Sequence, residues 1–276
     1  MQRILFSDLH PLTYRFSVSR LRLLRTIKDY TSNQTFSSTK QTTLLQYRLY
    51  RHNSLIRRKL GNVDLNLQNN KAVNLALAAP HVNHILIRPN EVFSFWNLVG
   101  HCTAEKGYKE GLTIKSGSTS SDIGGGMCQF TNLIHWLILH TDLEIIEHHH
   151  HDGIDLFPDY GRQIPFGTGT SIFYNYLDYR FVNNTQHTYQ LNVHVSDEYL
   201  HGEIRADHII NHRYHIEVEN EHFTQENGII YRNGRIMRTK IDKSTGLVLQ
   251  KELIKTNHAK VMYESSHLEI LNLDKP

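Results

Sequence analysis

The residues best suited to chemistry lie in the segment GGGMCQ, which comprises Gly124, Gly125, Gly126, Met127, Cys128 and Gln129. Three consecutive glycines allow backbone conformations closed to other residues, and they let a substrate or another segment approach closely. We expect Cys128 at the start of a helix, where unpaired N–H groups and the helix dipole lower a thiol pKa. The same N–H groups can hold a developing oxyanion. The segment therefore indicates a thiol nucleophile.

Each feature of this segment also has a structural explanation. A free cysteine often acts as a small buried hydrophobe, and a glycine-rich turn before a helix needs no catalytic reason. The chain has a second cysteine, Cys102, which lacks a comparable setting and is interpreted as structural. The pattern alone leaves both interpretations of Cys128 open.

A nucleophilic cysteine needs a base, usually histidine, oriented by a carboxylate or amide. Residues 147–155 offer Glu147, four consecutive histidines, Asp152 and Asp155. A helix over residues 129–140 would be about 18 Å long, and a strand of roughly five to eight residues returns over a comparable distance. The histidines are therefore expected near Cys128.

A metal site is the alternative use of the same residues. The chain contains 20 histidines, including the run at 148–151, and Cys128 with two of them could ligate zinc. Consecutive histidines on a strand point to opposite faces, however, and no paired Cys-x-x-Cys accompanies them. We predict no metal site and no cofactor. Arg162 can bind a carboxylate or phosphate, or brace its own loop.

The elements that must position these residues are indicated by periodicity. Helical spacing after Cys128 places five apolar residues on one face, and residues 142–147 are typical of a short buried strand. Residues 70–82 predict a helix that ends near Pro80, and residues 84–95 predict two short strands around Pro89-Asn90. From about residue 170 apolar and polar residues alternate, with a hairpin predicted at Asn233-Gly234. The five apolar residues are Phe130, Leu133, Ile134, Leu137 and Ile138.

These patterns predict an α+β protein, with a mixed helix and strand core followed by an antiparallel β region. We divide the chain into a basic, mainly helical region at 1–69 and an α+β domain at 70–276. Residues 1–60 carry twelve Lys and Arg but only two acids, although the net charge of the chain is +3. Within them, residues 19–28 alternate basic and leucine-type side chains.

Residues 19–28 fit either a surface helix with a basic solvent face or a helix on an anionic membrane surface. No nucleic-acid-binding motif accompanies them, so we expect no nucleic-acid partner. No stretch approaches the roughly 18 apolar residues that span a bilayer. No secretory signal is recognised, and two cysteines are too few for a disulfide framework. We therefore expect a cytoplasmic protein, peripheral at the inner membrane face if the basic region binds lipid.

Three long segments resemble the VanW family, which is named from glycopeptide-resistance gene clusters. The resemblance covers about residues 70–265. This sequence departs from the family pattern at His148 and Asp152, where arginine and serine are usual. It also departs at His84 and Asn90, where glycines are usual. The segments are RPNEVFSFWNLVGHCTAEKGYKEGL (88–112), the stretch 123–185 that begins with IGGGMCQF, and YQLNVHVSDEYLHGEIRAD (189–207).

The resemblance implies roles for particular residues. The family's Gly-Gly-Gly-x-Cys-Gln matches the GGGMCQ segment, and its later motif matches Glu147, His151 and Asp155. His151 becomes the implied base, Asp155 its orienting carboxylate, and Gln129 an oxyanion donor. The implied activity is acyl transfer or amide hydrolysis on a cell-wall peptide or its precursor, and Cys128→Ala should abolish it while the fold persists. The alternative is a binding or accessory module for an envelope precursor or partner protein, with the glycine loop as a ligand cradle.

Overall fold

The computed structural model describes residues 6, 9–58, 64–115, 118–150, 153–159, 161 and 163–272. The predicted α+β class is confirmed. No helix in the described ranges is long and apolar enough to cross a membrane. The helices are α1 (Pro11–Thr31), α2 (Leu65–Val82), α3 (Phe95–Val99), the 3-10 turn η2 (Ala104–Lys106) and α4 (Met127–Ile138).

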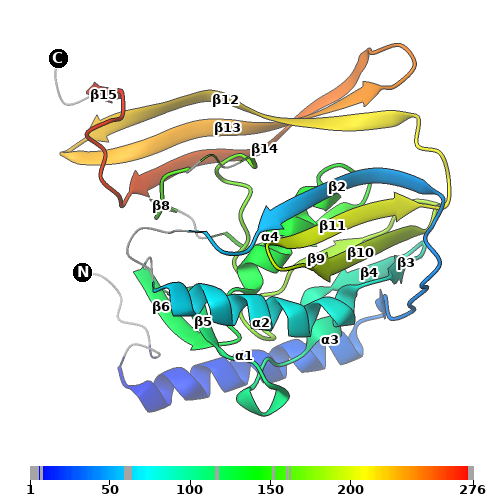
Figure 1. Ribbon diagram of the computed structural model, residues 1–276, viewed down its shortest axis with the longest axis horizontal. Helices are drawn as coiled ribbons and strands as arrows, with labels where there is room; N and C mark the ends of the chain where they lie inside the picture. The colour runs from blue at the N-terminus through cyan, green and yellow to red at the C-terminus, as the bar shows by residue number, and fades with distance from the viewer. Residues whose placement is uncertain are drawn as a thin grey trace.

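The strands form three larger sheets and one hairpin (Figure 1). The first sheet contains, in spatial order, β1 (Thr35–Phe36), β4 (Glu91–Ser94), β9 (Arg180–Val182) and β7 (Glu144–Glu147). The second contains β2 (Tyr47–Leu55), β11 (Tyr199–Ala206), β10 (Tyr189–Val195) and β3 (Ile85–Ile87). The third sheet is β15 (Ile270–Asn272), β12 (His212–Glu226), β13 (Ile229–Asp242), β14 (Val248–Val261) and β8 (Ile154–Asp155), and the hairpin is β5 (Glu110–Lys115) with β6 (Ser118–Ile123).

The main core lies between the β2-β11-β10-β3 sheet and two helices. Helix α4 packs against β2 and β11, and α2 packs against β10. The apolar face predicted after Cys128 is confirmed, because all five of its residues are at most 1% exposed. Since α4 begins immediately after the glycines, its burial fixes where the GGGMCQ segment lies.

Helix α2 and the strands after it follow the sequence prediction closely. Asp64 caps α2 by accepting a hydrogen bond of 2.8 Å from the Asn66 N–H, and the helix ends at Val82, two residues past Pro80. Strands β3 and β4 flank Asn90, which has a φ of 66°. The boundary predicted at residue 69 lies inside α2.

Two local predictions are wrong. Residues 47–55 form a strand rather than helical or irregular structure, because β2 pairs along its length with β11. Strand β7 is half exposed rather than buried, because it lies at the edge of its sheet. The described part of the N-terminal region is therefore not mainly helical, and its strand β2 belongs to the β2-β11-β10-β3 sheet.

The predicted antiparallel region is confirmed in the long strands β12, β13 and β14, but the predicted hairpin position is wrong. The turn between β12 and β13 lies at Asn227 and Gly228, whose φ values of 51° and 73° suit a two-residue hairpin. Asn233 instead pairs with His222 on β12 and with His258 on β14. Asn227-Gly228 and Asn233-Gly234 are both typical of two-residue hairpin turns, and only the pairing of the strands decides which of them forms the turn.

Candidate functional site

The glycine loop, residues 124–126, joins β6 to α4 and is held by α2. Asn74 on α2 is fully buried, and its Nδ2 donates to the carbonyl oxygens of Gly125 and Lys109, each at 2.9 Å. The Gly124 N–H donates to the same Lys109 oxygen at 3.0 Å. Gly124 and Gly126 have φ values of 78° and 100°, which favour glycine.

Close packing is a second reason for glycine at these positions. A Cβ on Gly125 would lie 2.1 Å from the carbonyl oxygen of Gly111, and one on Gly124 would lie 2.5 Å from the Cβ of Cys102. One on Gly126 would lie 2.3 Å from the Cγ of Lys71. The glycines are thus required by neighbouring protein segments, whatever ligand also approaches them.

A pocket of about 250 Å³ opens beside this loop. All three glycines and Cys128 contribute to its wall. Gly126 is the N-cap of α4 and offers no side-chain acceptor to the first-turn N–H groups. The Gln129 N–H donates to the Gly126 carbonyl oxygen at 3.0 Å, so the N–H groups of Met127 and Cys128 remain for water or a ligand. The rest of the wall includes Arg22, Trp96, His101, Cys102, Asp122 and Tyr174.

Arg22 brings a positive charge to the pocket from α1. Its Nε donates to the carbonyl oxygen of Tyr174 at 2.8 Å, while its terminal nitrogens make no hydrogen bond to any described residue. The ring of His101 stacks on Tyr174 with centroids 4.4 Å apart. Burial and the charge of Arg22 lower the pKa of His101.

The thiol of Cys128 differs from the sequence expectation. Cys128 is only partly exposed, and burial raises its pKa, while the N–H of Ile172 acts in the opposite direction. This direction is opposite to the expected lowering of the pKa, because burial has a larger effect than the hydrogen bonds from the backbone N–H groups of Ile172 and Cys128. The thiol is protonated at neutral pH. Burial also raises the pKa of Cys102, to about 11.

Gln129 does not present its amide to the pocket. Its Nε2 donates to the Ser54 hydroxyl and to the carbonyl oxygen of Leu55, both at 2.9 Å. These bonds fasten the first turn of α4 to the end of β2.

Asp155 lies on β8 and is 1% exposed. Its Oδ2 is 3.2 Å from Arg232 and accepts a hydrogen bond of 2.9 Å from the Tyr263 hydroxyl. The carboxylate therefore takes part in a buried ion pair of the C-terminal sheet. His151 and Arg162 lie outside the described residues.

The described part of the histidine run packs farther along α4. Burial, and next the nearby His150, lower the pKa of His148 to about 3. Its ring lies 4.1 Å from that of His135, which follows Cys128 by seven residues, or about 10 Å of helix. His149 contacts Glu147 at 3.0 Å. No group of three or more potential metal ligands occurs among the described residues.

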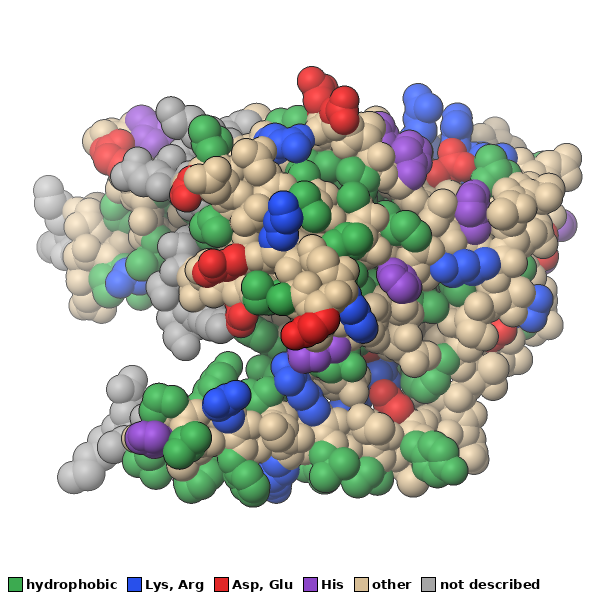
Figure 2. All heavy atoms as spheres, turned by 60° about the horizontal axis from the view of Figure 1, so that its bottom comes forward, with side chains coloured by type: hydrophobic (Ala, Val, Ile, Leu, Met, Phe, Trp, Pro, Cys, Tyr) green, Lys and Arg blue, Asp and Glu red, His purple; other side chains and the backbone are tan. Residues whose placement is uncertain are grey.

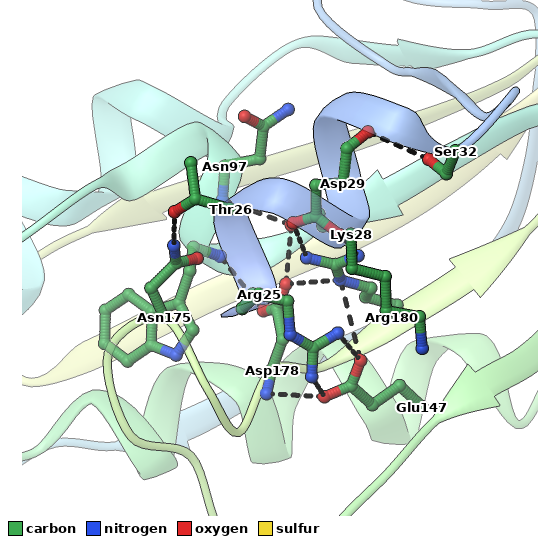
Figure 3. A network of polar contacts seen from close by, with 12 residues as sticks. Arg25, Thr26, Lys28, Asp29, Ser32, Asn97, Glu147, Asn175, Asp178 and Arg180 are labelled. Atoms are coloured by element: carbon green, nitrogen blue, oxygen red, sulfur yellow. Dashed lines mark hydrogen bonds and ion pairs between the residues drawn. The ribbon is translucent and has the colours of Figure 1, made fainter. Parts of the chain in front are cut away.

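Glu147 binds helix α1 to the α+β domain that follows it in the chain (Figure 3). Both of its oxygens accept hydrogen bonds of 2.6 Å from Arg25, and one also accepts from the Asp178 N–H at 2.9 Å. Burial opposes ionisation, but the bonds from Arg25 lower the pKa of Glu147. Glu147 thus stays charged and holds α1.

Sequence reasoning missed several residues around the loop, namely Arg22, Asn74, His101 and Lys71. Lys71 is 7% exposed on α2, and burial, followed by the nearby arginines, lowers its pKa to about 7. A polar residue inside the apolar run of α2 was the available signal for Asn74 and Lys71. The other two come from segments distant in sequence, and no local pattern links them to Cys128.

Comparisons with known proteins identify one family. The family described as VanW like protein matches residues 70–205. The vancomycin B-type resistance protein VanW of Enterococcus faecalis (strain ATCC 700802 / V583) is 36% identical over 215 residues, which cover 78% of this chain and 75% of that protein. The uncharacterized protein YoaR of Bacillus subtilis (strain 168) is 30% identical over 113 residues, covering 40% and 34% respectively. No solved structure matches.

Proposed function

The chain belongs to the VanW family, and from this premise we propose that it is a binding or accessory protein for an envelope precursor. Its ligand site is the pocket at the glycine loop, and the group bound there is a carboxylate or phosphate. The name of the Enterococcus faecalis relative refers to vancomycin resistance, which directs the proposal to cell-wall peptides and their precursors.

The observation that carries this proposal is the set of donors on one pocket wall. The first-turn N–H groups of α4 have no capping side chain, and the positive helix end favours an anion. Arg22 adds a guanidinium whose terminal nitrogens are free of described partners, and guanidinium groups suit carboxylate and phosphate. Trp96 and Tyr174 supply apolar surface for the rest of a ligand.

A thiol-dependent acyl transfer or amide hydrolysis is the second candidate. Cys128 lies on the pocket wall beside the first-turn N–H groups, which is the arrangement needed for attack by Sγ on a carbonyl and for holding the resulting oxyanion. Binding is the better supported function because the thiol pKa is raised. In addition, Asp155 and Gln129, which the catalytic hypothesis requires, have partners elsewhere.

Calorimetric titration tests the binding proposal. A peptidoglycan-precursor peptide with a free terminal carboxylate is compared with the same peptide amidated at that end. We expect the carboxylate form to bind, and Arg22→Gln to weaken its binding about tenfold, because a charge-assisted hydrogen bond is lost.

Arg20→Gln is the matched control, since Arg20 lies on the same helix but outside the pocket wall. It should leave the dissociation constant unchanged. Equal affinity for the amidated peptide, or no effect of Arg22→Gln in a folded variant, contradicts the proposal.

A further inference from the structure

Helix α1 contacts the rest of the protein through its polar side. Arg22, Arg25 and Asp29 all point toward the domain, where Arg25 pairs with Glu147 and both oxygens of Asp29 accept from Arg180 at 2.6–2.7 Å. None of the residues in α1 is buried. The sequence interpretation of a basic solvent face is therefore wrong for these residues, because the pairing carboxylates lie on the domain side.

The apolar side of α1 faces away from the protein. The large apolar residues at positions 12, 16, 23, 27 and 30 are four, seven, four and three positions apart. This spacing places them on one face of a helix. Figure 2 shows hydrophobic side chains along this helix, in the lower lobe of the view. The exposed fractions are 65% for Leu12, 65% for Phe16, 61% for Leu23, 50% for Ile27 and 91% for Tyr30.

Such an arrangement is the reverse of an ordinary surface helix, whose apolar stripe packs on the core. A contiguous apolar surface of this kind marks a site of interaction with another molecule or with a membrane. What covers it can be inferred from the charges beside it.

The exposed charges on α1 are all positive. Arg15, Arg20 and Lys28 make no ion pair with a described residue, and Asp29, the only acid between residues 9 and 31, is paired with Arg180. A second copy of the chain would place these cations against one another. An anionic lipid surface complements them instead.

We propose that α1 lies in the surface of an anionic membrane, with Leu12, Phe16, Leu23, Ile27 and Tyr30 entering the acyl boundary. Its 21 residues give about 31 Å of helix parallel to the bilayer. Arg22 belongs both to α1 and to the pocket wall, so the pocket lies next to the lipid headgroups. The membrane contact does not depend on what the pocket binds.

Co-sedimentation of the full chain with lipid vesicles tests this proposal. We expect partition onto vesicles of phosphatidylglycerol and phosphatidylcholine, and much less onto phosphatidylcholine alone. The triple variant Phe16→Ser/Leu23→Ser/Ile27→Ser should lower the partition coefficient by at least about tenfold. Arg20→Gln/Lys28→Gln should lower it about tenfold on the anionic vesicles only.

The matched control is Leu247→Ser/Val248→Ser/Leu249→Ser. These residues are also 56–66% exposed, but Leu247 directly precedes β14 and the other two begin it. This variant should bind vesicles as the parent protein does. Circular dichroism verifies that the variants are folded.

A second measurement locates the contact directly. Tryptophan introduced as Leu23→Trp should be quenched by vesicles of brominated lipid, and Leu249→Trp should not. The proposal is overturned if the parent protein ignores anionic vesicles or if the triple variant binds equally well. It is also overturned if the stripe instead forms a dimer that the triple substitution abolishes and vesicles do not compete for.

Discussion

Cys128 occupies a helix position that favours an ionised thiol, yet its surroundings favour the neutral form. A helix N-terminus contributes roughly 0.3–2 kcal/mol to a nearby negative charge, whereas desolvation can shift a buried group by several pKa units. Here burial is the larger effect and raises the pKa of the thiol. The chemistry of this residue is set by its packing.

We expect Cys128 to react slowly with iodoacetamide at pH 7. In a Cys102→Ala background, which leaves one thiol, the rate should increase through the alkaline range and above the transition of a free cysteine, since the folded-state pKa is raised. Mass spectrometry of the alkylated peptide over a pH series measures this.

Free cysteine in the same buffers provides the reference curve. Rapid alkylation at pH 7, with a transition below that of the free amino acid, would contradict the raised pKa and favour the nucleophile hypothesis over simple binding.

Helix α1 depends on ion pairs for its attachment to the domain. It has no buried residue, and an isolated helix of this kind is only marginally stable in water. The pairs of Arg25 with Glu147 and of Asp29 with Arg180 therefore hold it, together with hydrogen bonds from Arg22 and Arg25 to backbone carbonyl oxygens. The paired side chains are partly buried, so salt screens them incompletely.

Arg25→Gln should release α1 without unfolding the domain. We expect hydrogen exchange over residues 11–31 to accelerate, which corresponds to a loss of about 1–3 kcal/mol in local stability. High salt should enhance the effect. Mass spectrometry of deuterium uptake measures both.

Arg15→Gln is the control for this variant, because Arg15 is on the same helix and has no described ion-pair partner. Uptake over 11–31 should match that of the parent protein. Unchanged protection in Arg25→Gln would show that the pairs do not hold the helix.

At the scale of the whole molecule, α4 connects the main core with the C-terminal sheet of β12, β13 and β14. Its Trp136, with Leu139 just beyond the helix, forms a second apolar cluster with Ile216 and Ile236 of the C-terminal sheet. Close to this cluster, Asp142 accepts hydrogen bonds from Tyr214 at 2.7 Å, Lys240 at 2.9 Å and His212 at 2.8 Å. The attachment of the long sheet thus combines apolar contact with one carboxylate.

The attachment should depend on pH through Asp142. Burial raises its pKa, but the hydrogen bonds from Tyr214 and Lys240 outweigh burial and leave the pKa below its ordinary value. As pH falls, the Asp142 carboxyl is therefore protonated at a higher pH in the unfolded chain than in the folded protein. The stabilisation from Asp142 is present at pH 7 and is lost as pH falls below about 4. Asp142→Asn should reduce the free energy of unfolding by about 1–3 kcal/mol at pH 7.

Chemical denaturation of the variant and the parent protein at several pH values tests this, and the two should converge in acid. Asp197→Asn is the control, since that exposed side chain makes no described ion pair. A difference between the Asp142 variant and the parent protein that persists unchanged at low pH would exclude the proposed linkage.

Local periodicity was enough to predict much of the fold. The buried face of α4, the end of α2 near Pro80 and the antiparallel C-terminal strands all follow from spacing within short windows. The glycine loop and Cys128 were also identified from sequence, because glycines before an apolar helix form a local signal. Strand β2 was missed because its partner strand β11 lies far along the chain. The hairpin at Asn227-Gly228 was missed because two Asn-Gly dipeptides occur close together, and the register of β12 with β13 decides which one forms the turn.

By itself, the sequence determined the family, the α+β class and the position of a glycine loop at the start of a buried helix. Only the tertiary structure decided which groups meet there. In the folded protein Arg22 lies on the pocket wall, and the apolar side of α1 is exposed. Gln129 is hydrogen-bonded to β2, and Asp155 is paired with Arg232. The physical reason is that a pattern fixes the period of an element, whereas long-range packing fixes which side chains lose water and which charges become partners.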